Sequence, residues 1–491
     1  MSTFVADLPA HDAPAIVTLD RMLSYTELVA RVEGLAGRLA AGGVGPERVC
    51  VVALERGPEA VIAIAAVLRA GAAFLAVDVD LPDQRIASLV TGADALLTTA
   101  ALAQRFATLD VPGPTILLDG PGPTAAPPSG VAPRSLAYVS HTSGSTGTPN
   151  AVLIEHRWLH AYLRFVARDH RLGPDTVAVQ LAPLGFDASI RDIFAPLVAG
   201  GRLVMLPRSA LLRPDEFLAA LDRFEVNTML SVTPSFLTFL ARHDGVARRL
   251  RGLRLVGTTG ESMRPFLASG GRHLISGRLV NQYGPTEGTM TATRFEVPVA
   301  ADTTADLIGT PIDGVAVRLL DNDLRPVPDG SPGEVCIASA GVARGYAGRP
   351  ALTAERFMPD PFGAPGTRLY RTGDLARRRP DGNLEYLGRA DRQIKIRGYR
   401  VDPAEVEGVL LTHPAVTGAA VTAVTDEQAR TYLVAHLTGE LAEVGDAALR
   451  GYLAQKLPPH MMPRRFARLT RFPTTRTGKI DRRALTAGGV R

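Results

Sequence analysis

The sequence LAYVSHTSGSTGTP, residues 136–149, contains a run rich in hydroxyl side chains and glycine. Apolar residues 136–139 precede this run, and apolar residues 151–154 follow it. The pattern predicts two strands with a loop between them. Because Gly144 and Gly147 permit turns that expose backbone N–H groups, the loop is suited to wrap the oxygens of a polyphosphate. A plain connection between strands has the same composition, so this stretch alone leaves both interpretations open.

The loop is not a Walker A phosphate loop. That pattern ends in Gly-Lys followed by Ser or Thr, whereas Thr148 and Pro149 follow Gly147 here. A role in phosphate binding must therefore be judged from motifs elsewhere in the chain.

Length and composition exclude several classes of protein. The chain has 491 residues, more than one hydrophobic core usually holds, so at least two domains are expected. A net charge of +5, from 54 basic and 49 acidic residues, does not indicate a nucleic-acid partner. The distant Cys50 and Cys336 argue against a disulfide framework or a zinc site. Together with an N-terminus unlike a signal peptide, they favour a cytoplasmic protein.

The N-terminal half alternates predicted helices and strands. The apolar stretch 61–77 is interrupted by Arg69 and Gly71, which favours a buried helix followed by a buried strand over a membrane span. We therefore expect no membrane partner. Residues 23–44 space apolar side chains at helical intervals and end in two glycines, which predicts an amphipathic helix. This alternation is typical of an α/β fold.

A further helix is predicted in FDASIRDIFAPLVAGG, residues 186–201. An apolar stripe leaves Asp187 and Arg191 four residues apart on an adjoining face. Such a pair is either a solvated ion pair within the helix or part of the wall of a polar pocket.

Two other polar loops follow short apolar segments. GTTGES follows residues 253–256, and YGPTEGT follows residues 279–282. Loops at the carboxyl ends of strands line the ligand crevice of open α/β sheets, although unrelated turns have the same appearance.

The C-terminal hundred residues read as a small α+β domain, with a boundary at GRAD, residues 388–391. Asp381 and Gly382 predict a hairpin before this boundary. Asp402 is the expected N-cap of a helix that runs to about His413, with Glu405 completing a capping box. Two strands and a helix are expected at 415–424, 432–437 and 447–457.

In this order and spacing, the motifs resemble the adenylate-forming superfamily, and within it the amino-acid-activating adenylation domains of nonribosomal peptide synthetases. The resemblance rests first on the glycine-rich loop and on FDAS (186–189), YGPTE (283–287), YRTGDL (370–375), GRADRQIKIRGYR (388–400) and TGKIDR (477–482). It extends to LSYTEL (23–28), LRAGAAFLAVD (68–78), GEVCIASAGVARGYAGRP (333–350) and LPPHMMP (457–463), and so covers nearly the whole chain.

The resemblance implies an α/β protein with two domains. Residues 1–389 would form a large core of layered α/β sheets with several subdomains, and residues 390–491 a small, mobile α+β lid. An amino acid's carboxylate would attack the α-phosphorus of ATP, releasing pyrophosphate in a reaction that uses Mg²⁺. The phosphopantetheine thiol of a separate carrier protein would then take the aminoacyl group.

The resemblance also assigns nucleotide-binding residues. Glu287 would ligate Mg²⁺, Tyr283 would lie against the adenine, and Asp374, helped by Arg389, would bind the ribose hydroxyls. The β- and γ-phosphates would lie in the glycine-rich loop. The nucleotide-binding set is Thr142, Ser143, Gly144, Ser145, Thr146, Gly147, Gly260, Tyr283, Gly284, Thr286, Glu287, Asp374 and Arg389.

Three C-terminal residues are implied to act in turn. Lys479 would bridge the substrate carboxylate and the α-phosphate during adenylation. Rotation of the lid about Asp391 would then withdraw Lys479 and bring forward the face that carries Lys395 for the thiol step.

Asp187 matches the family residue that pairs with the substrate's α-ammonium, and the resemblance implies a polar side-chain pocket beside it. Arg191 in this pocket indicates a polar substrate side chain, a carboxylate or a carboxamide, unless Arg191 pairs with Asp187 or Asp192 and only shortens the pocket. The residues that would bind the substrate are Asp187, Ala188, Arg191, Ser231, Gly257, Thr259, Gln282, Met290 and Thr291.

One departure from the family pattern bears on activity. The family usually has Pro-Lys-Gly after the loop, but this chain has Pro149, Asn150 and Ala151. The missing ammonium would weaken contact with pyrophosphate, so adenylation is expected to be slower or assisted by another base such as Arg157.

The sequence contains no carrier-type Ser motif and no condensation-type HHxxxD sequence. We therefore expect a stand-alone ligase, unless this sequence is one part of a longer synthetase. Two other interpretations stay open. An AMP-forming acyl-CoA or aryl-acid ligase is the nearest alternative enzyme, and Asn150 leaves room for a catalytically silent accessory module.

Overall fold

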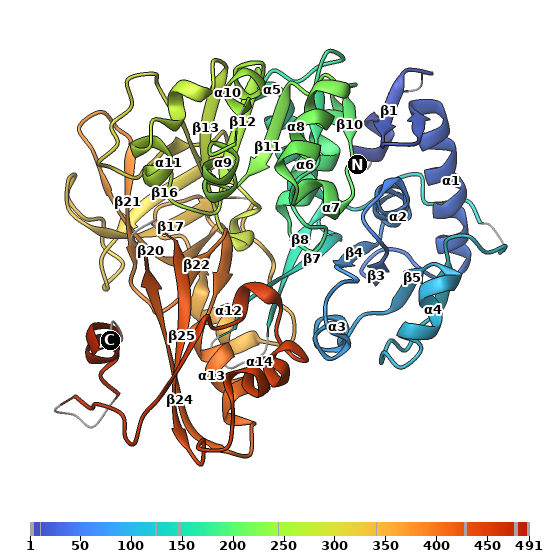
Figure 1. Ribbon diagram of the computed structural model, residues 1–491. Helices are drawn as coiled ribbons and strands as arrows, with labels where there is room; N and C mark the ends of the chain where they lie inside the picture. The colour runs from blue at the N-terminus through green and yellow to red at the C-terminus, as the bar shows by residue number, and fades with distance from the viewer. Residues whose placement is uncertain are drawn as a thin grey trace. The chain divides into compact units, whose positions relative to one another are not determined.

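The computed structural model describes residues 4–9, 11–122, 125–144, 149–243, 245–339, 341–426, 430–475 and 480–488 (Figure 1). The chain divides into two compact units. The first contains Met1–Val79, Val90–His141 and Ala151–Ala390, and the second contains Asp80–Leu89, Thr142–Asn150 and Asp391–Arg491.

One sheet contains the two strands predicted around the glycine-rich loop, which are confirmed. Among the described residues it has seven strands in the order β18-β8-β7-β4-β3-β5-β6. Strand β4 is parallel to β3 and β7, and β5 is parallel to β3 and β6. Its strands are β3 (Val49–Ala53), β4 (Ala73–Val77), β5 (Ala95–Thr98), β6 (Thr115–Leu117), β7 (Leu136–Thr142), β8 (Asn150–Glu155) and β18 (Gly345–Tyr346).

A second sheet has fourteen strands within the described ranges, in the order β16-β17-β20-β21-β15-β14-β13-β12-β11-β9-β10-β1-β2, with β19 on β20. Strands β10, β9, β11, β12 and β13 are all parallel, and β14 onward are antiparallel. The strands are β1 (Pro14–Val17), β2 (Met22–Ser24), β9 (Val177–Val179), β10 (Arg202–Val204), β11 (Thr228–Val232), β12 (Leu255–Thr259), β13 (Arg278–Tyr283), β14 (Thr293–Glu296), β15 (Leu307–Pro311), β16 (Val315–Leu320), β17 (Gly333–Ser339), β19 (Phe357–Pro359), β20 (Arg368–Arg378) and β21 (Leu384–Arg389).

The parallel strands place two hydrophobic cores on opposite faces of the sheet. Successive side chains of a strand point to opposite faces. Accordingly, Leu255 and Val280 belong to one core, while their neighbours Val256 and Leu279 belong to the other. The first core also takes residues from the seven-stranded sheet, so it lies between two layers of strands. This arrangement confirms the predicted layered α/β class.

Helices fill and cover these cores. Helix α1 (Tyr25–Ala41) begins with a capping box of Ser24 and Glu27, and α2 (Pro58–Arg69) is almost wholly buried. Both confirm the N-terminal predictions. The other helices are η1 (Phe4–Asp7), α4 (Ala100–Phe106), α5 (His156–Asp169), α6 (Ala188–Val198), α7 (Arg208–Leu211), α8 (Pro214–Arg223), α9 (Pro234–Leu240), α10 (Val246–Arg251), α11 (Arg264–Ala268), η2 (Gly271–Leu274), η3 (Thr286–Gly288) and α12 (Pro350–Arg356).

The C-terminal part of the second unit has an α+β fold with its own hydrophobic core. Strands β24 (Val416–Thr425) and β25 (Thr431–Gly439) are antiparallel, and β26 (Arg465–Arg468) is parallel to β25. The other elements of the unit are α3 (Asp83–Val90), β22 (Ile394–Ile396), β23 (Tyr399–Val401), α13 (Pro403–Leu411), α14 (Asp446–Ala454), η4 (Pro459–Met461) and α15 (Arg482–Gly488).

One local prediction is wrong. Asp402 caps α13 by accepting from the Ala404 N–H at 3.0 Å, as expected. Glu405 does not complete the capping box, because its Oε1 accepts instead from Arg85 Nη1 at 2.6 Å within the same unit. A buried carboxylate gains more from a guanidinium than from a neutral N–H donor.

None of the helices in the described part of the chain is long and apolar enough to cross a membrane.

Candidate active site

A buried arginine organises the predicted substrate pocket. Arg191 lies on α6 and is only 1% exposed. Its Nε donates to Ser231 Oγ on β11 at 2.9 Å. Its Nη1 lies within hydrogen-bonding distance of Gln282 Oε1 at 3.1 Å and Thr291 Oγ1 at 3.0 Å. Tyr162 OH on α5, which the sequence did not indicate, is a further acceptor for Nη1 at 3.1 Å. The guanidinium is thus held by four separate segments of the chain.

The groups around Arg191 are themselves fixed by hydrogen bonds. Gln282 Nε2 donates to the Leu230 carbonyl at 3.0 Å, which turns its Oε1 towards Arg191. Ser231 Oγ donates to the Ala188 carbonyl at 3.1 Å. Amide and hydroxyl side chains whose donors are used in this way present only acceptors to the guanidinium.

A glycine makes room for this arrangement. A Cβ atom on Gly257 would lie 2.6 Å from Gln282 Nε2 and 2.7 Å from the Leu230 carbonyl oxygen. Both contacts are closer than real Cβ atoms show, so only glycine leaves the bond between Gln282 and Leu230 intact. This gives Gly257 a physical role beyond simply shaping the pocket.

The remaining pocket residues lie beside this cluster. Thr259 is the register partner of Gln282 on the neighbouring strand. Thr289 and Met290 have positive φ angles of 59° and 69°, a left-handed conformation that is costly for residues with a Cβ. This strained turn leads directly into Thr291. The structure therefore places Ser231, Gln282 and Thr291 against Arg191, with Thr259 and Met290 next to these residues in the sheet or in the chain.

Asp187 stands at the N-terminus of α6, one turn before Arg191. Its Oδ2 is enclosed and has no hydrogen-bond partner among the described residues. Burial raises the pKa of this carboxyl, although a hydrogen bond with Thr286 and the charge of Arg191 oppose the rise. The carboxylate therefore lacks one partner.

Within the described ranges, no carboxylate forms a salt bridge with Arg191. Asp192 Oδ2 instead accepts from the backbone N–H groups of Leu181 and Ala182, both at 2.9 Å. The alternative that Arg191 pairs with Asp187 or Asp192 is therefore not supported by the geometry.

A second cluster surrounds Asp374. Tyr283 OH donates to its Oδ2 at 2.6 Å, and Arg389 Nη1 donates to its Oδ1 at 2.5 Å. Asp374 and Arg389 are register partners on β20 and β21. Tyr386 OH also donates to Oδ1, at 3.3 Å, and was not identified from the sequence. Three of the residues assigned to the nucleotide thus form one network.

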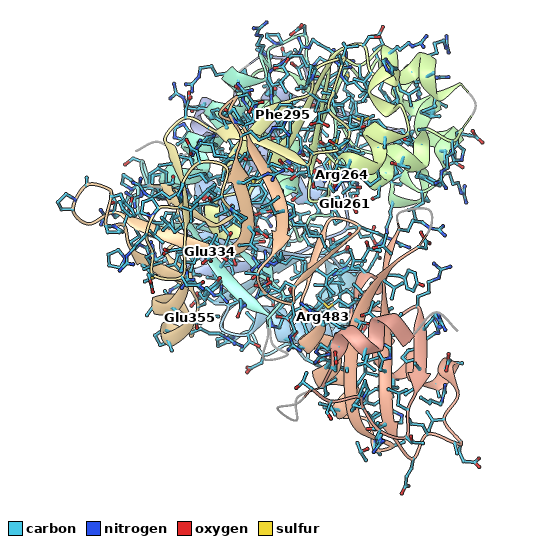
Figure 2. All side chains as sticks on the ribbon, turned by 90° about the vertical axis from the view of Figure 1, so that its left-hand side faces the viewer. Glu261, Arg264, Phe295, Glu334, Glu355 and Arg483 are labelled. Carbon is cyan, nitrogen blue, oxygen red and sulfur yellow. The ribbon has the colours of Figure 1, made fainter. Side chains whose placement is uncertain are left out.

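Glu334, labelled in Figure 2, positions the strand that carries Asp374. Its Oε2 accepts from Arg371 Nη2 at 2.6 Å, and its Oε1 accepts from the Gly373 N–H at 3.0 Å. Glu334 lies in one of the motifs on which the family resemblance rests, but its contacts with Arg371 and Gly373 are visible only in the structure.

Glu287 fits the role of a metal ligand. It lies in the short turn η3, is 1% exposed, and accepts from Tyr346 OH at 2.8 Å through Oε1. No group of three or more His, Cys, Asp or Glu residues able to hold a metal occurs in the described part of the chain. Mg²⁺ commonly binds through one or two carboxylates and the oxygens of substrate phosphates, so a single buried glutamate suits it.

Two glycines of the predicted nucleotide-binding set, Gly260 and Gly284, stand where a residue with a side chain would be strained or would clash. Gly260 follows β12 with φ of 86°, a conformation that other residues rarely adopt. A Cβ on Gly284, which follows β13, would lie 2.7 Å from the Met290 carbonyl oxygen. Both loops therefore turn sharply at the ends of neighbouring parallel strands.

The glycine-rich loop is described in part. Thr142 ends β7, and the Oγ of Ser143 is buried without a hydrogen-bond partner among the residues that the structure places. Asn150 Nδ2 donates to the Ser143 carbonyl at 3.5 Å, so this side chain stabilises the loop's own backbone. An orphaned hydroxyl suits an anionic oxygen. Ser145, Thr146 and Gly147 lie outside the described residues.

Arg157, the suggested substitute for the missing lysine, is already engaged. Its Nε donates to Glu155 Oε2 at 2.7 Å, and its guanidinium lies 4.6 Å from the centroid of the Trp158 ring.

The second unit holds the remaining predicted residues. Asp391 is the first residue after the division between Ala390 and the C-terminal segment, and its Oδ1 accepts from the Gln393 N–H at 3.1 Å. Lys395 lies on β22 and is half-buried. Lys479 lies outside the described residues.

Known proteins resemble this chain in sequence and in fold. The family model "AMP-binding enzyme" matches residues 5–347, and "AMP-binding enzyme C-terminal domain" matches residues 405–479. The dimodular nonribosomal peptide synthase of Bacillus subtilis is 38% identical over 97% of this chain. The chain spans only 21% of that relative's length.

Two solved structures resemble the whole chain. Holo-PA1221, a nonribosomal peptide synthetase protein with adenylation and PCP domains, matches with 27% identity and a TM-score of 0.81, covering 99% of this chain and 84% of its own. AB3403, a four-domain nonribosomal peptide synthetase bound to AMP and glycine, matches with 29% identity and a TM-score of 0.70, covering 98% and 35%.

The match to the AMP-binding family model spans 343 residues, from 5 to 347, which is well over half of the 491 residues of the chain. With relatives of this kind along nearly its whole length, the chain belongs to the AMP-binding enzyme family and is an adenylation domain of the adenylate-forming superfamily.

Proposed function

We propose that this protein activates an amino acid with a polar side chain as its aminoacyl-adenylate. The reaction consumes ATP and releases pyrophosphate. One observation carries the proposal: adjacent residues of β13 serve two different clusters, Gln282 the pocket around Arg191 and Tyr283 the network around Asp374. Both residues end β13, and Tyr283 belongs to the same hydrophobic core as Val280, so an amino acid and a nucleotide bound at these clusters would meet at the carboxyl end of this strand.

Asp187 supplies the contact that selects an amino acid. Its unpartnered Oδ2 is an acceptor for an α-ammonium group, which would restore the charge that burial disfavours. Holding the ammonium fixes the α-carbon and therefore the direction in which the reactive carboxylate points.

The Asp374 network supplies the nucleotide contact. A carboxylate whose position is fixed by Tyr283 and Arg389 is suited to accept hydrogen bonds from two ribose hydroxyls. Mg²⁺, held by Glu287 and the phosphates, would supply neutralisation of the charge that accumulates as pyrophosphate leaves.

Residues 390–491 act as a mobile lid in this proposal, and residues 1–389 as the core. Lys479 neutralises the anionic transition state of adenylation, and Lys395 belongs to the face used in the second step. Asp391 is the hinge, which agrees with its place at the division between the compact units.

The second step transfers the aminoacyl group to the phosphopantetheine thiol of a separate carrier protein. The relatives that contain PCP or further synthetase domains support a carrier as the acceptor. Free, buried Cys50 and Cys336 suit a reducing cytoplasm, where we place the reaction.

The proposal is tested by incubating the protein with ATP, Mg²⁺, a panel of amino acids and a holo carrier protein. Intact mass of the carrier and the amount of AMP are then measured. We expect aminoacylated carrier with the wild type and loss of AMP formation with Lys479→Ala. With Lys395→Ala we expect exchange of pyrophosphate into ATP without carrier loading, because AMP leaves the adenylate only when the thiol takes the aminoacyl group.

Other outcomes contradict the proposal. Loading of acyl or aryl acids by Asp187→Ala, at the wild-type rate, would favour an acyl-CoA or aryl-acid ligase. AMP formation that Lys479→Ala leaves unchanged would mean that the assigned lysine takes no part in the chemistry.

A further inference from the structure

One nitrogen of Arg191 has no hydrogen-bond partner among the residues that the structure describes. Its Nε and Nη1 are taken by the hydroxyl and amide oxygens of Ser231, Tyr162, Gln282 and Thr291. Its Nη2 is out of contact with solvent and makes no hydrogen bond with any residue that the structure describes. A guanidinium carries five N–H donors, of which Nη2 holds two. Two aligned donors on a fully buried cation therefore remain unused.

We propose that this nitrogen binds a carboxylate at the end of the substrate's side chain, so that the pocket selects an acidic amino acid. The inference rests on the proposed amino-acid activation and names its substrate class.

Charge favours a carboxylate over other acceptors. A guanidinium stays protonated at any pH at which the protein is folded, and a buried cation is strongly disfavoured without an opposite charge. The contacts of Arg191 are to neutral oxygens, and no described carboxylate lies within salt-bridge distance. A side-chain carboxylate supplies both an acceptor and a negative charge. A carboxamide supplies only the acceptor, and an aliphatic side chain supplies neither.

The second unpartnered group of the pocket has the opposite charge. Asp187 Oδ2 is also enclosed and has no hydrogen-bond partner in the described ranges, and Asp187 stands four residues before Arg191 at the start of the same helix. Four residues correspond to a rise of about 6 Å along a helix. An amino acid with an acidic side chain presents an ammonium to one group and a carboxylate to the other. The two unpartnered atoms are thereby satisfied by one molecule.

The surrounding hydrogen bonds hold Arg191 for this role. Gln282 is oriented by the Leu230 carbonyl, and Ser231 by the Ala188 carbonyl, so the acceptors on Nε and Nη1 have fixed positions. A planar guanidinium pinned along one side presents its remaining edge in a defined direction. A lysine at position 191 would carry a single ammonium group, which cannot reach the separate acceptors that Nε and Nη1 of Arg191 contact.

The test is amino-acid-dependent exchange of labelled pyrophosphate into ATP, measured as kcat/KM. Aspartate, glutamate and 2-aminoadipate are compared with asparagine, glutamine, leucine and lysine. We expect the best acidic substrate to exceed its own amide by at least about 100-fold, because a buried charge pair is replaced by a neutral contact.

Variants show whether Arg191 is responsible. Arg191→Met should lower kcat/KM for the acidic substrate by at least about 100-fold and reverse the order of acid and amide. The matched control is Arg38→Met, which removes another arginine whose hydrogen bonds within the described residues go to neutral acceptors, the carbonyls of Leu117, Leu118 and Gly120. This control should keep the ratio of acid to amide.

The outcomes separate the two levels of the proposal. If the wild type prefers a neutral or basic amino acid, the inference of an acidic substrate is wrong, but the proposed amino-acid activation is not contradicted. This outcome is measured on the wild type and needs no variant. An unchanged ratio in folded Arg191→Met also overturns the inference. Absence of exchange with every amino acid overturns the proposed function itself.

Discussion

At the scale of single residues, Asp187 is the clearest conflict between stability and function. Its Oδ2 is enclosed and has no hydrogen-bond partner in the part of the chain that the structure describes, and burial raises the pKa of the carboxyl group. Between the ordinary pKa of an aspartate and this raised value, the folded state binds more protons than the unfolded state. Stability from this residue therefore falls as the pH rises through that window. A substrate ammonium would reverse the effect by favouring the ionised form.

Asp187→Asn tests this interpretation. The amide needs no counter-ion, so the unliganded variant should unfold at the same temperature as the wild type or higher at pH 7.5. Its kcat/KM in amino-acid-dependent exchange should fall at least about 100-fold, because the ammonium loses its charged partner. Thermal unfolding and exchange are measured on the same preparation. A melting temperature lowered by several degrees would show that Asp187 stabilises the fold.

Gly257 gives a second prediction at this scale. Gly257→Ala would force Gln282 away from the Leu230 carbonyl, because the new Cβ would lie 2.6 Å from Gln282 Nε2. A displaced Gln282 releases Arg191, so we expect kcat/KM to fall about 10- to 100-fold. Gly34→Ala is the control: its Cβ would meet nothing within 4 Å, and alanine inside α1 should stabilise the protein by about 0.5–1 kcal/mol. Full activity of Gly257→Ala would contradict the role assigned to this glycine.

At the scale of elements, local signals succeeded where neighbours in sequence decide the outcome. The amphipathic helix predicted within residues 23–44 forms as α1, and the structure adds a capping box: Ser24 accepts from the Glu27 N–H, and the Glu27 carboxylate accepts from the Ser24 N–H at 2.8 Å. The capping box predicted at Glu405 does not form. Its partner, Arg85, lies 320 residues away in the sequence, beyond the reach of a local rule.

The capping box of α1 can be measured directly. Ser24→Ala removes the hydroxyl acceptor, so the free energy of opening of α1, from hydrogen exchange, should fall by about 1 kcal/mol. Ser269→Ala, which loses only a bond to the Phe266 carbonyl within its own turn, should change protection by less than about 0.5 kcal/mol. Equal effects of the two substitutions would show that the cap adds nothing.

The site itself was only partly predictable. Arg191, Gln282 and Asp374 could be assigned from the sequence, because each lies in a motif that the family shares or a few residues from one. Tyr162 and Tyr386 were missed, since ordinary helical and strand positions carry no such signal. They reach the site only because α5 lies beside α6 and β21 beside β20.

At the scale of the whole molecule, buried histidines set the response to acid. His156 is 5% exposed, and burial lowers its pKa to about 4. His170 is 3% exposed, and burial with the nearby charge of Arg191 lowers its pKa to about 3. The unfolded chain takes up these protons near pH 6.5, whereas the folded protein does not. Each histidine therefore destabilises the fold as the pH falls below 6.5.

His156→Gln should flatten this response. Between pH 6.5 and about 4 each buried histidine contributes a slope of up to about 1.4 kcal/mol per pH unit, and the substitution removes one such contribution. Unfolding free energies are measured at half-unit steps across this range. Leu212→Gln, at an exposed position, changes no titratable group, so it is the control and should leave the slope unchanged. A wild-type stability that does not decrease below pH 6.5 would contradict the assignment of neutral, buried histidines.

The central claim is that the two clusters joined by β13 activate an amino acid as its adenylate. Exchange of labelled pyrophosphate into ATP, measured with the purified chain and each amino acid separately, tests it most directly. We predict exchange that depends on an amino acid, is strongest with an acidic side chain, and is abolished in Asp187→Ala. Exchange that needs no amino acid, or none with any amino acid, would contradict the account.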